Sequence, residues 1–163
     1  MNTPTTLRRP NRISGFTLME VLIALVILSI GLLGLAGLQA AGLRYNHSSY
    51  LRSQATLLAY DIVDRMRANR QEALNGAYTI GLGTLPAAPT SCTGSVASCT
   101  PAQMTADDLY QWETALKNTL PSGTGSIASV RIAQNTQFTI TVQWTDDQTP
   151  GAPAQQFVLM TEL

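Results

Sequence analysis

Histidine and cysteine are scarce in this chain, whose 163 residues include one histidine and two cysteines. A metal centre needs several His, Cys or carboxylate ligands close together, and His47 has no such cluster beside it. We therefore expect His47 at the surface and predict no metal site. The sequence also has no nucleophile elbow and no phosphate-binding loop. These absences predict a protein that is not an enzyme, with no cofactor and no small-molecule substrate.

Charge is scarce as well, and it is missing altogether from Val21 to Leu43. As a helix, this run would extend roughly 34 Å, which is enough to cross the hydrocarbon core of a bilayer. Before it stand Arg8, Arg9 and Arg12, with no acidic residue among them. Positive residues resist translocation, so the sequence predicts a single-pass membrane protein with a cytoplasmic N-terminus.

Glu20 immediately precedes the uncharged run. A carboxylate beside hydrocarbon is costly unless it is paired or neutralised, and such residues are by default functional. An ordinary signal anchor would leave Glu20 unexplained. A cleaved secretory signal would have a shorter apolar core and a small-residue cleavage site, for which residues 37–42 offer only a weak candidate. Both alternatives stay open on physical grounds alone, but Glu20 itself favours a cationic partner.

The segment Gly15-Phe16-Thr17-Leu18-Met19-Glu20, with a short basic leader before it and a long apolar helix after it, resembles the class III signal of type IV pilins and of type II secretion pseudopilins. The resemblance implies that an inner-membrane prepilin peptidase cleaves between Gly15 and Phe16 and N-methylates Phe16. It divides the chain into a cleaved leader (1–15), a transmembrane and filament-core helix (16–43), and a periplasmic head (44–163). The protein is then expected in the bacterial inner membrane before assembly and in a surface filament afterwards.

The resemblance also gives Glu20 a role in assembly. Cleavage creates an ammonium group on Phe16, which the Glu20 carboxylate of a neighbouring subunit can neutralise inside the apolar filament core. At about 4 Å such a pair is attractive by roughly 4 kcal/mol at an effective dielectric constant of 20, before desolvation is subtracted. A slipped neighbour would leave both charges buried alone, so Glu20 is predicted to set the assembly register.

Periodicity predicts one long helix from Phe16 to about Leu74, with a uniformly apolar first half and an amphipathic second half. In that second half, helix-spaced ion pairs are expected between Asp61 and Arg65 and between Asp64 and Arg67. The helix should end near Asn75 and Gly76. The head is expected to pack on an apolar face at spacings of three and four residues, comprising Leu51, Ala55, Leu58, Ile62 and Met66.

An irregular loop is predicted from Gly81 to Pro101, and it contains Cys92 and Cys99. In an extracytoplasmic domain, two cysteines are most simply a disulfide, worth about 2.5 kcal/mol for so short a loop. Thr105 is then expected to cap a second helix over about 106–120, with an apolar stripe of Leu109, Trp112, Leu116 and Leu120. Alternating apolar residues predict strands over 127–132, 138–144 and 157–163, the last antiparallel to the second, with Phe157 and Leu159 pointing inward.

These elements predict an α+β fold, and the resemblance implies that it is of the type IV pilin kind. The long N-terminal helix, half membrane-embedded and half amphipathic, packs on a small antiparallel β-sheet head with one additional helix. In this arrangement, each apolar face covers another.

Four further segments, residues 59–70, 108–123, 142–144 and 161–163, are similar to minor pilins of the type IV pilus modification family. This likeness implies a subunit that takes part in priming pilus assembly and enters the filament, with other minor pilins and the major pilin as partners. Two alternatives remain: a minor pseudopilin of type II secretion, and a tip adhesin or DNA-binding pilin. After Arg70 the only basic residues are Lys117 and Arg131, which argues against a broad nucleic-acid surface on the head.

Overall fold

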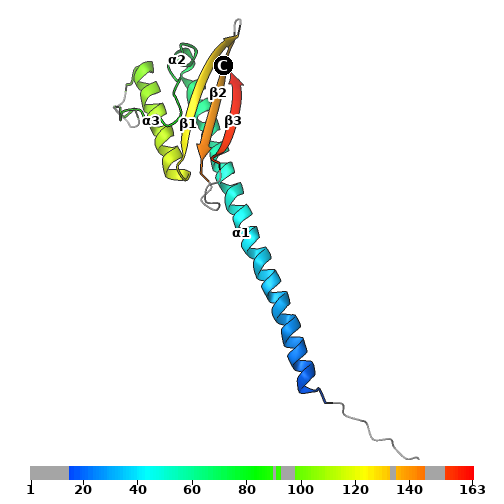
Figure 1. Ribbon diagram of the computed structural model, residues 1–163. Coiled ribbons are helices and arrows are strands. Elements are labelled where there is room, and N and C mark those ends of the chain that lie inside the picture. The colour runs from blue at the N-terminus through cyan, green and yellow to red at the C-terminus, as the bar shows by residue number, and fades with distance from the viewer. Residues whose placement is uncertain (1–14, 90, 93–97, 133–134, 146–152) are drawn as a thin grey trace, which may run out of the picture. The chain divides into compact units, whose positions relative to one another are not determined.

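The computed structural model describes residues 15–89, 91–92, 98–132, 135–145 and 153–163. The described chain contains three helices and three strands, which are labelled in Figure 1: α1 (Leu18–Ala68), α2 (Arg70–Leu74), α3 (Pro101–Thr119), β1 (Thr124–Ile132), β2 (Asn135–Trp144) and β3 (Gln155–Glu162). The chain divides into two compact units, Met1–Leu43 and Arg44–Leu163, here named the membrane unit and the head. Of the predicted leader, only Gly15 is among the described residues.

In the membrane unit, every described side chain is exposed, including the whole apolar run of α1. By length and composition, α1 can cross a membrane, and it is the one helix of the described chain that can. A helix that is apolar on all sides normally lies in a protein core or a bilayer. The exposed run therefore needs an apolar environment that this chain alone does not supply.

The predicted long helix begins later and is interrupted. It starts at Leu18 instead of Phe16, and it stops at Ala68, because Asn69 leaves helical geometry (φ −116°, ψ 48°) before α2 resumes. The Asn69 side chain bonds to α3, which explains the break in physical terms. The predicted end near Asn75 and Gly76 is confirmed, since Asn75 caps α2 and Gly76 takes a positive φ of 82° that glycine adopts without strain.

The second half of α1 supplies one wall of the core. Its predicted apolar face is confirmed, although Leu58 is only partly buried. Both predicted ion pairs form, with Arg65 Nε 2.9 Å from Asp61 Oδ2 and Arg67 Nη1 2.9 Å from Asp64 Oδ1. The residues of α1 that are buried in the head are Leu51, Ala55, Ala59, Ile62, Val63 and Met66.

The prediction that Thr105 caps α3 is wrong. Thr100 is the N-cap: its hydroxyl accepts from the backbone N–H of Gln103 at 3.3 Å, and the Gln103 side chain accepts from the Thr100 N–H at 2.9 Å. This reciprocal capping box, with Pro101 at the first helical position, is a stronger start signal than Thr105. Thr105 lies one turn inside the helix and is buried. The predicted stripe of α3 is confirmed, since Leu109, Trp112, Leu116 and Leu120 are all buried.

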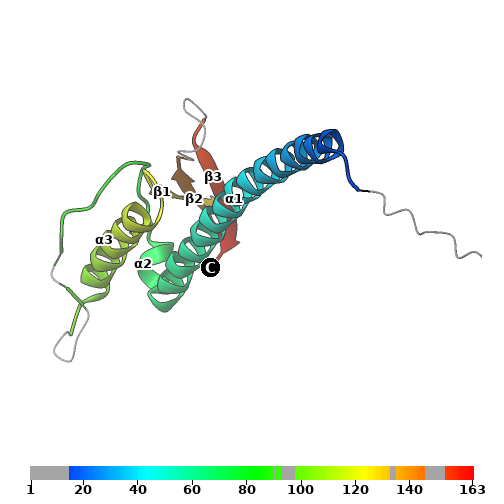
Figure 2. The same ribbon diagram turned by 90° about the horizontal axis from the view of Figure 1, so that it is seen from below.

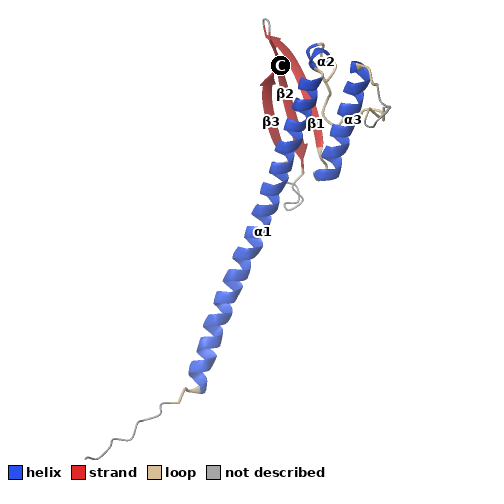
Figure 3. Ribbon diagram, turned by 180° about the vertical axis from the view of Figure 1, so that it is seen from behind, coloured by secondary structure: helices blue, strands red, loops and turns tan. Residues whose placement is uncertain are grey.

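The three strands form one antiparallel sheet in the order β1-β2-β3. Each strand begins two or three residues earlier than predicted. Ile127, Ile140 and Leu159 pair across the sheet and face the core, and the inward direction predicted for Phe157 and Leu159 is confirmed. Figure 3 shows the second half of α1 lying across one face of the sheet, and Figure 2 shows α3 on the β1 side. The structure thus has the type IV pilin fold, with a long N-terminal helix, a small antiparallel sheet and one extra helix.

Candidate functional site

The start of α1 is a capped helix end. The Thr17 hydroxyl accepts from the backbone N–H of Glu20 at 3.3 Å, and the Thr17 carbonyl accepts from the N–H groups of Glu20 and Val21 at 3.1 and 3.3 Å. Thr17 and Glu20 have the spacing of a capping box. Because Thr17 starts the helix, the bond between Gly15 and Phe16 stays outside helical structure, where a peptidase can reach it.

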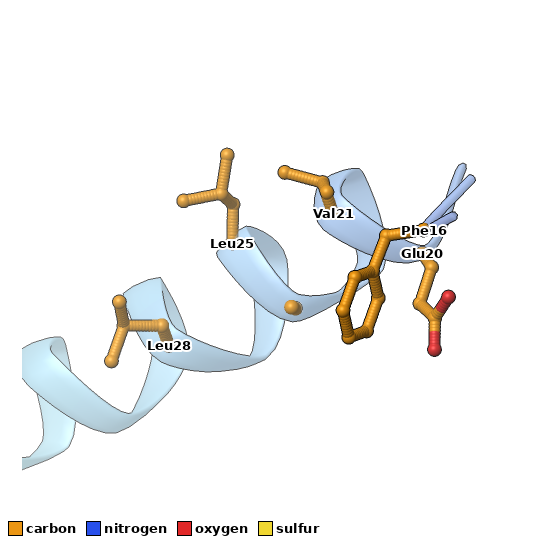
Figure 4. A pocket seen from close by; sticks show the side chains of 6 residues that line it. Phe16, Glu20, Val21, Leu25 and Leu28 are labelled. Carbon is orange, nitrogen blue, oxygen red and sulfur yellow. The ribbon is translucent and has the colours of Figure 1, made fainter. Parts of the chain in front are cut away.

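Phe16 and Glu20 lie side by side at this end. The Phe16 side chain is 84% exposed, and a Cβ added at Gly15 would meet nothing within 4 Å. Figure 4 shows the Phe16 ring and the Glu20 carboxylate on the same side of the helix, at the mouth of a shallow apolar groove. Apart from these two residues, the groove is lined by Val21, Ala24, Leu25 and Leu28.

Within the described part of the chain, Glu20 takes part in no ion pair. It sits in the first turn of α1, where the positive end of the helix dipole favours an acid. That partial charge is weaker than a full counter-charge. Glu20 can therefore accept a cation at the membrane end of α1.

The predicted disulfide is present in the head, with Cys92 and Cys99 joined at 2.05 Å. Residues 93–97, inside the loop that it closes, lie outside the described residues. Both ends of the loop are tied to α3. The backbone N–H of Cys92 donates to Asp107 Oδ2 at 3.1 Å, and Cys99 directly precedes the N-cap Thr100.

A buried polar cluster joins α1, α3 and the segment after α2. The Tyr78 hydroxyl donates to Asp108 Oδ2 at 2.6 Å, and Arg65 Nη1 lies 3.3 Å from Asp108 Oδ1. Tyr78 is fully buried. Burial, together with the hydrogen bond to Asp108, raises the pKa of Tyr78 to about 12.

Asn69 completes this cluster at the break between α1 and α2. Its Nδ2 lies 2.8 Å from the Pro101 carbonyl, 3.0 Å from Thr105 Oγ1 and 3.3 Å from the Tyr78 hydroxyl. These three acceptors all belong to α3 or to the segment that follows α2. The end of α1 is thereby fixed to the first turns of α3.

Gln111 connects the same cluster to the disulfide loop. Its Oε1 accepts from Arg65 Nη1 at 3.1 Å, and its Nε2 donates to Asp107 Oδ2 at 2.8 Å. Asp107 in turn holds the backbone N–H of Cys92. A continuous set of hydrogen bonds therefore runs from α1 through α3 to the disulfide.

This cluster was not predicted from the sequence. A signal was present, because Asp108 precedes Trp112 by four residues and so shares its buried face. The same spacing separates Leu109 from Glu113. Glu113 is fully buried; its Oε1 accepts from the Gly125 N–H at 2.9 Å, and its Oε2 has no hydrogen-bond partner among the residues that the structure describes. Burial raises the pKa of Glu113, although Gly125 and the charge of Lys117 oppose the shift.

The head carries no arrangement suited to metal chemistry in the ranges that the structure describes, where no three His, Cys, Asp or Glu side chains converge. His47 is exposed, as predicted. The buried polar cluster is structural, because it links α1 to α3 and to the segment after α2. The features that point outward to other molecules are the Phe16 and Glu20 end of α1 and the exposed apolar run behind it.

Comparison with known protein families agrees with this geometry. Residues 10–36 match the model of the prokaryotic N-terminal methylation motif, and residues 37–110 match the model of type IV pilin Tt1218. No curated protein and no solved structure gives a significant match. The motif implies processing by a prepilin peptidase and assembly with other pilins. The start of the chain is therefore similar to the N-terminal methylation motif, and the stretch that follows it is similar to a type IV pilin domain.

Proposed function

We propose that this protein is a minor pilin of the type IV pilus modification family, also called PilV. In this role it helps to prime assembly of the type IV pilus and is incorporated into the filament. The observation that carries the proposal is the position of Glu20. It is the only charged residue between Arg12 and Arg44, and it lies beside Phe16 in the first turn of an exposed apolar helix.

In the proposed pathway, prepilin peptidase hydrolyses the bond between Gly15 and Phe16 and releases residues 1–15. It then transfers a methyl group from a methyl donor to the new amine of Phe16, which releases a proton. The amine remains protonated after methylation, so it is a cation at the membrane end of α1. When α1 packs beside a neighbouring subunit, the Glu20 carboxylate of one chain neutralises the amine of another. The energy of this pair is offset by desolvation, so its main effect is to exclude wrong registers.

The match to a type IV pilin model over residues 37–110 supports a pilus subunit over a pseudopilin of type II secretion. The two candidates differ in the deletion phenotype. Deleting a pilus subunit should impair twitching and leave protein secretion intact. Loss of protein secretion with normal twitching would instead indicate a pseudopilin of type II secretion.

The direct test is replacement of Glu20 by alanine in the native cell. We expect E20A to insert into the membrane and to lose its leader, but to be absent from sheared filaments. Ser29→Ala is the matched control, because Ser29 is an exposed polar residue of the same apolar helix, and its hydroxyl donates to the Leu25 carbonyl of that helix at 2.6 Å. S29A should reach filaments at the wild-type level. Equal recovery of E20A and S29A in filaments would refute the role of Glu20.

A further inference from the structure

In the described structure, one edge of the sheet is bridged at one position and the other edge is open. On the β1 side, Ile80 forms a bridge with Ile127, and each backbone N–H donates to the carbonyl of the other, at 3.0 and 2.9 Å. On the other side, β2 is the one strand of the described residues with which β3 pairs. Figure 3 shows β3 at the sheet edge far from α3, with no helix or strand along its outer side.

The open edge lacks the features that natural proteins use to block strand pairing. Such features are lysine, proline, a bulge or a very short strand. β3 has eight residues, QQFVLMTE, and its pairing with β2 is regular over all of them. Its only charge is Glu162, at its final position. The edge therefore presents uninterrupted backbone donors and acceptors to the surroundings.

The side chains of β3 add an apolar surface at this edge. Val158 and Met160 are 43% and 64% exposed on the sheet face that points away from the core, and Phe157 and Leu159 are only partly buried on the core side. An added strand would cover apolar side chains on both faces. An unpaired strand edge specifies its ligand more closely than an apolar patch does, because only an extended backbone satisfies its hydrogen bonds.

We propose that β3 is a docking edge for an extended segment of a different pilin subunit, which adds to the sheet as a fourth strand. That segment is apolar at alternate positions and, by charge complementarity, carries a basic residue opposite Glu162, whose exposed carboxylate has only the neutral Asn135 Nδ2 as its hydrogen-bond donor among the described residues, at 3.1 Å. This inference rests on the proposed function, which places other pilin heads beside this one.

A second copy of this chain fits the edge less well. β3 of a second copy contains no basic residue, so it would leave Glu162 without a cation. Pairing of β3 with β1 of another copy meets the bridge that Ile80 already forms with Ile127.

Hydrogen exchange of the full-length chain tests the proposal. In an antiparallel edge strand, about half of the backbone amides face outward. In native membranes that contain the other pilins, these outward-facing amides of β3 should exchange about tenfold more slowly than in the purified chain. The double variant Val158→Lys with Met160→Lys should abolish this difference, because lysine blocks strand addition.

The matched control is Val130→Lys with Ile132→Lys. These residues are 59% and 52% exposed and lie on the same face of the sheet, at the opposite edge. The control should keep the slow exchange of β3. The proposal would be overturned if wild-type β3 exchanged at the same rate in membranes and in the purified chain. It would also be overturned if both double variants lost the slow exchange of β3 to the same extent. A chain that reaches filaments without β3 protection refutes only this inference, whereas β3 protection in a chain that never enters filaments refutes only the proposed function.

Discussion

The carboxylate of Asp108 binds Tyr78 with one oxygen and Arg65 with the other, at 2.6 and 3.3 Å. Tyr78 follows α2, Asp108 lies on α3, and Arg65 lies in the last turn of α1. One buried side chain therefore holds together three segments that are far apart in the sequence. Its removal should loosen the head where α1 ends.

Tyr78→Phe should lower the free energy of unfolding of the head by about 1–3 kcal/mol, because it leaves a buried carboxylate oxygen without its short hydrogen bond. Urea denaturation of residues 44–163 measures this change. Tyr60→Phe is the control, since Tyr60 is 50% exposed on α1, and its hydroxyl loss should leave stability unchanged. Equal effects of the two substitutions would contradict the structural role of Tyr78.

Glu113 should make the head less stable as the pH rises. Its pKa in the folded head is raised above the ordinary value of 4.5 by burial, so the folded state holds this proton more tightly than the unfolded state. The associated stability is complete below pH 4.5 and is lost as the pH rises through the raised pKa. Urea denaturation from pH 4 to pH 8 should show this decline in the wild type and a flatter profile in Glu113→Gln. Glu162→Gln, at an exposed position, is the control and should keep the wild-type dependence of stability on pH. If E113Q lost stability with rising pH as the wild type does, groups other than Glu113 would be responsible.

Gly125 has no room for a side chain. A Cβ there would overlap the ring of Trp112 and lie 2.8 Å from Leu116 Cδ1. Gly125→Ala should cost about 1–3 kcal/mol, because α3 and β1 must separate to accept the methyl group. Thermal unfolding compares it with Gly81→Ala, where the added Cβ would make only an ordinary 3.5 Å contact with Thr84. A G125A head as stable as the G81A head would show that α3 packs differently on β1.

The disulfide should stabilise the head chiefly by restricting the unfolded chain. Replacing Cys92 and Cys99 by serine opens an eight-residue loop and should lower the free energy of unfolding by about 2.5 kcal/mol. Dithiothreitol should produce the same loss in the wild type and no further loss in the variant. A variant that is as stable as the oxidised wild type would contradict this contribution.

Local patterns in the sequence are sufficient to predict most of the fold. The buried faces of α1 and α3 follow helical spacing, and the alternation from Phe138 to Trp144 defines β2, because both patterns depend on neighbouring residues alone. The capping of α3 was harder to predict. Thr100 lies inside a stretch rich in Pro, Ser and Thr, so its partnership with Gln103 was obscured by composition.

The polar cluster could not be predicted from local patterns, because its partners are distant in sequence. Asp108 lies 30 residues from Tyr78 and 43 from Arg65. Helical spacing shows that Asp108 shares the buried face of Trp112, but only the fold brings the tyrosine and arginine to it. The assembly site is the opposite case. Gly15, Phe16 and Glu20 lie within six consecutive residues, so the motif can be recognised from the sequence alone.

The most direct test of the account is the intact mass and N-terminal sequence of the protein extracted from native membranes. The account predicts a chain that begins with N-methyl-Phe16 and is lighter by the two hydrogens that the bond between Cys92 and Cys99 removes. A chain that still begins at Met1, or that is cut after Ala41, would contradict it. The protein would then be an ordinary membrane anchor or a secreted domain, and Glu20 would have no amine to pair with.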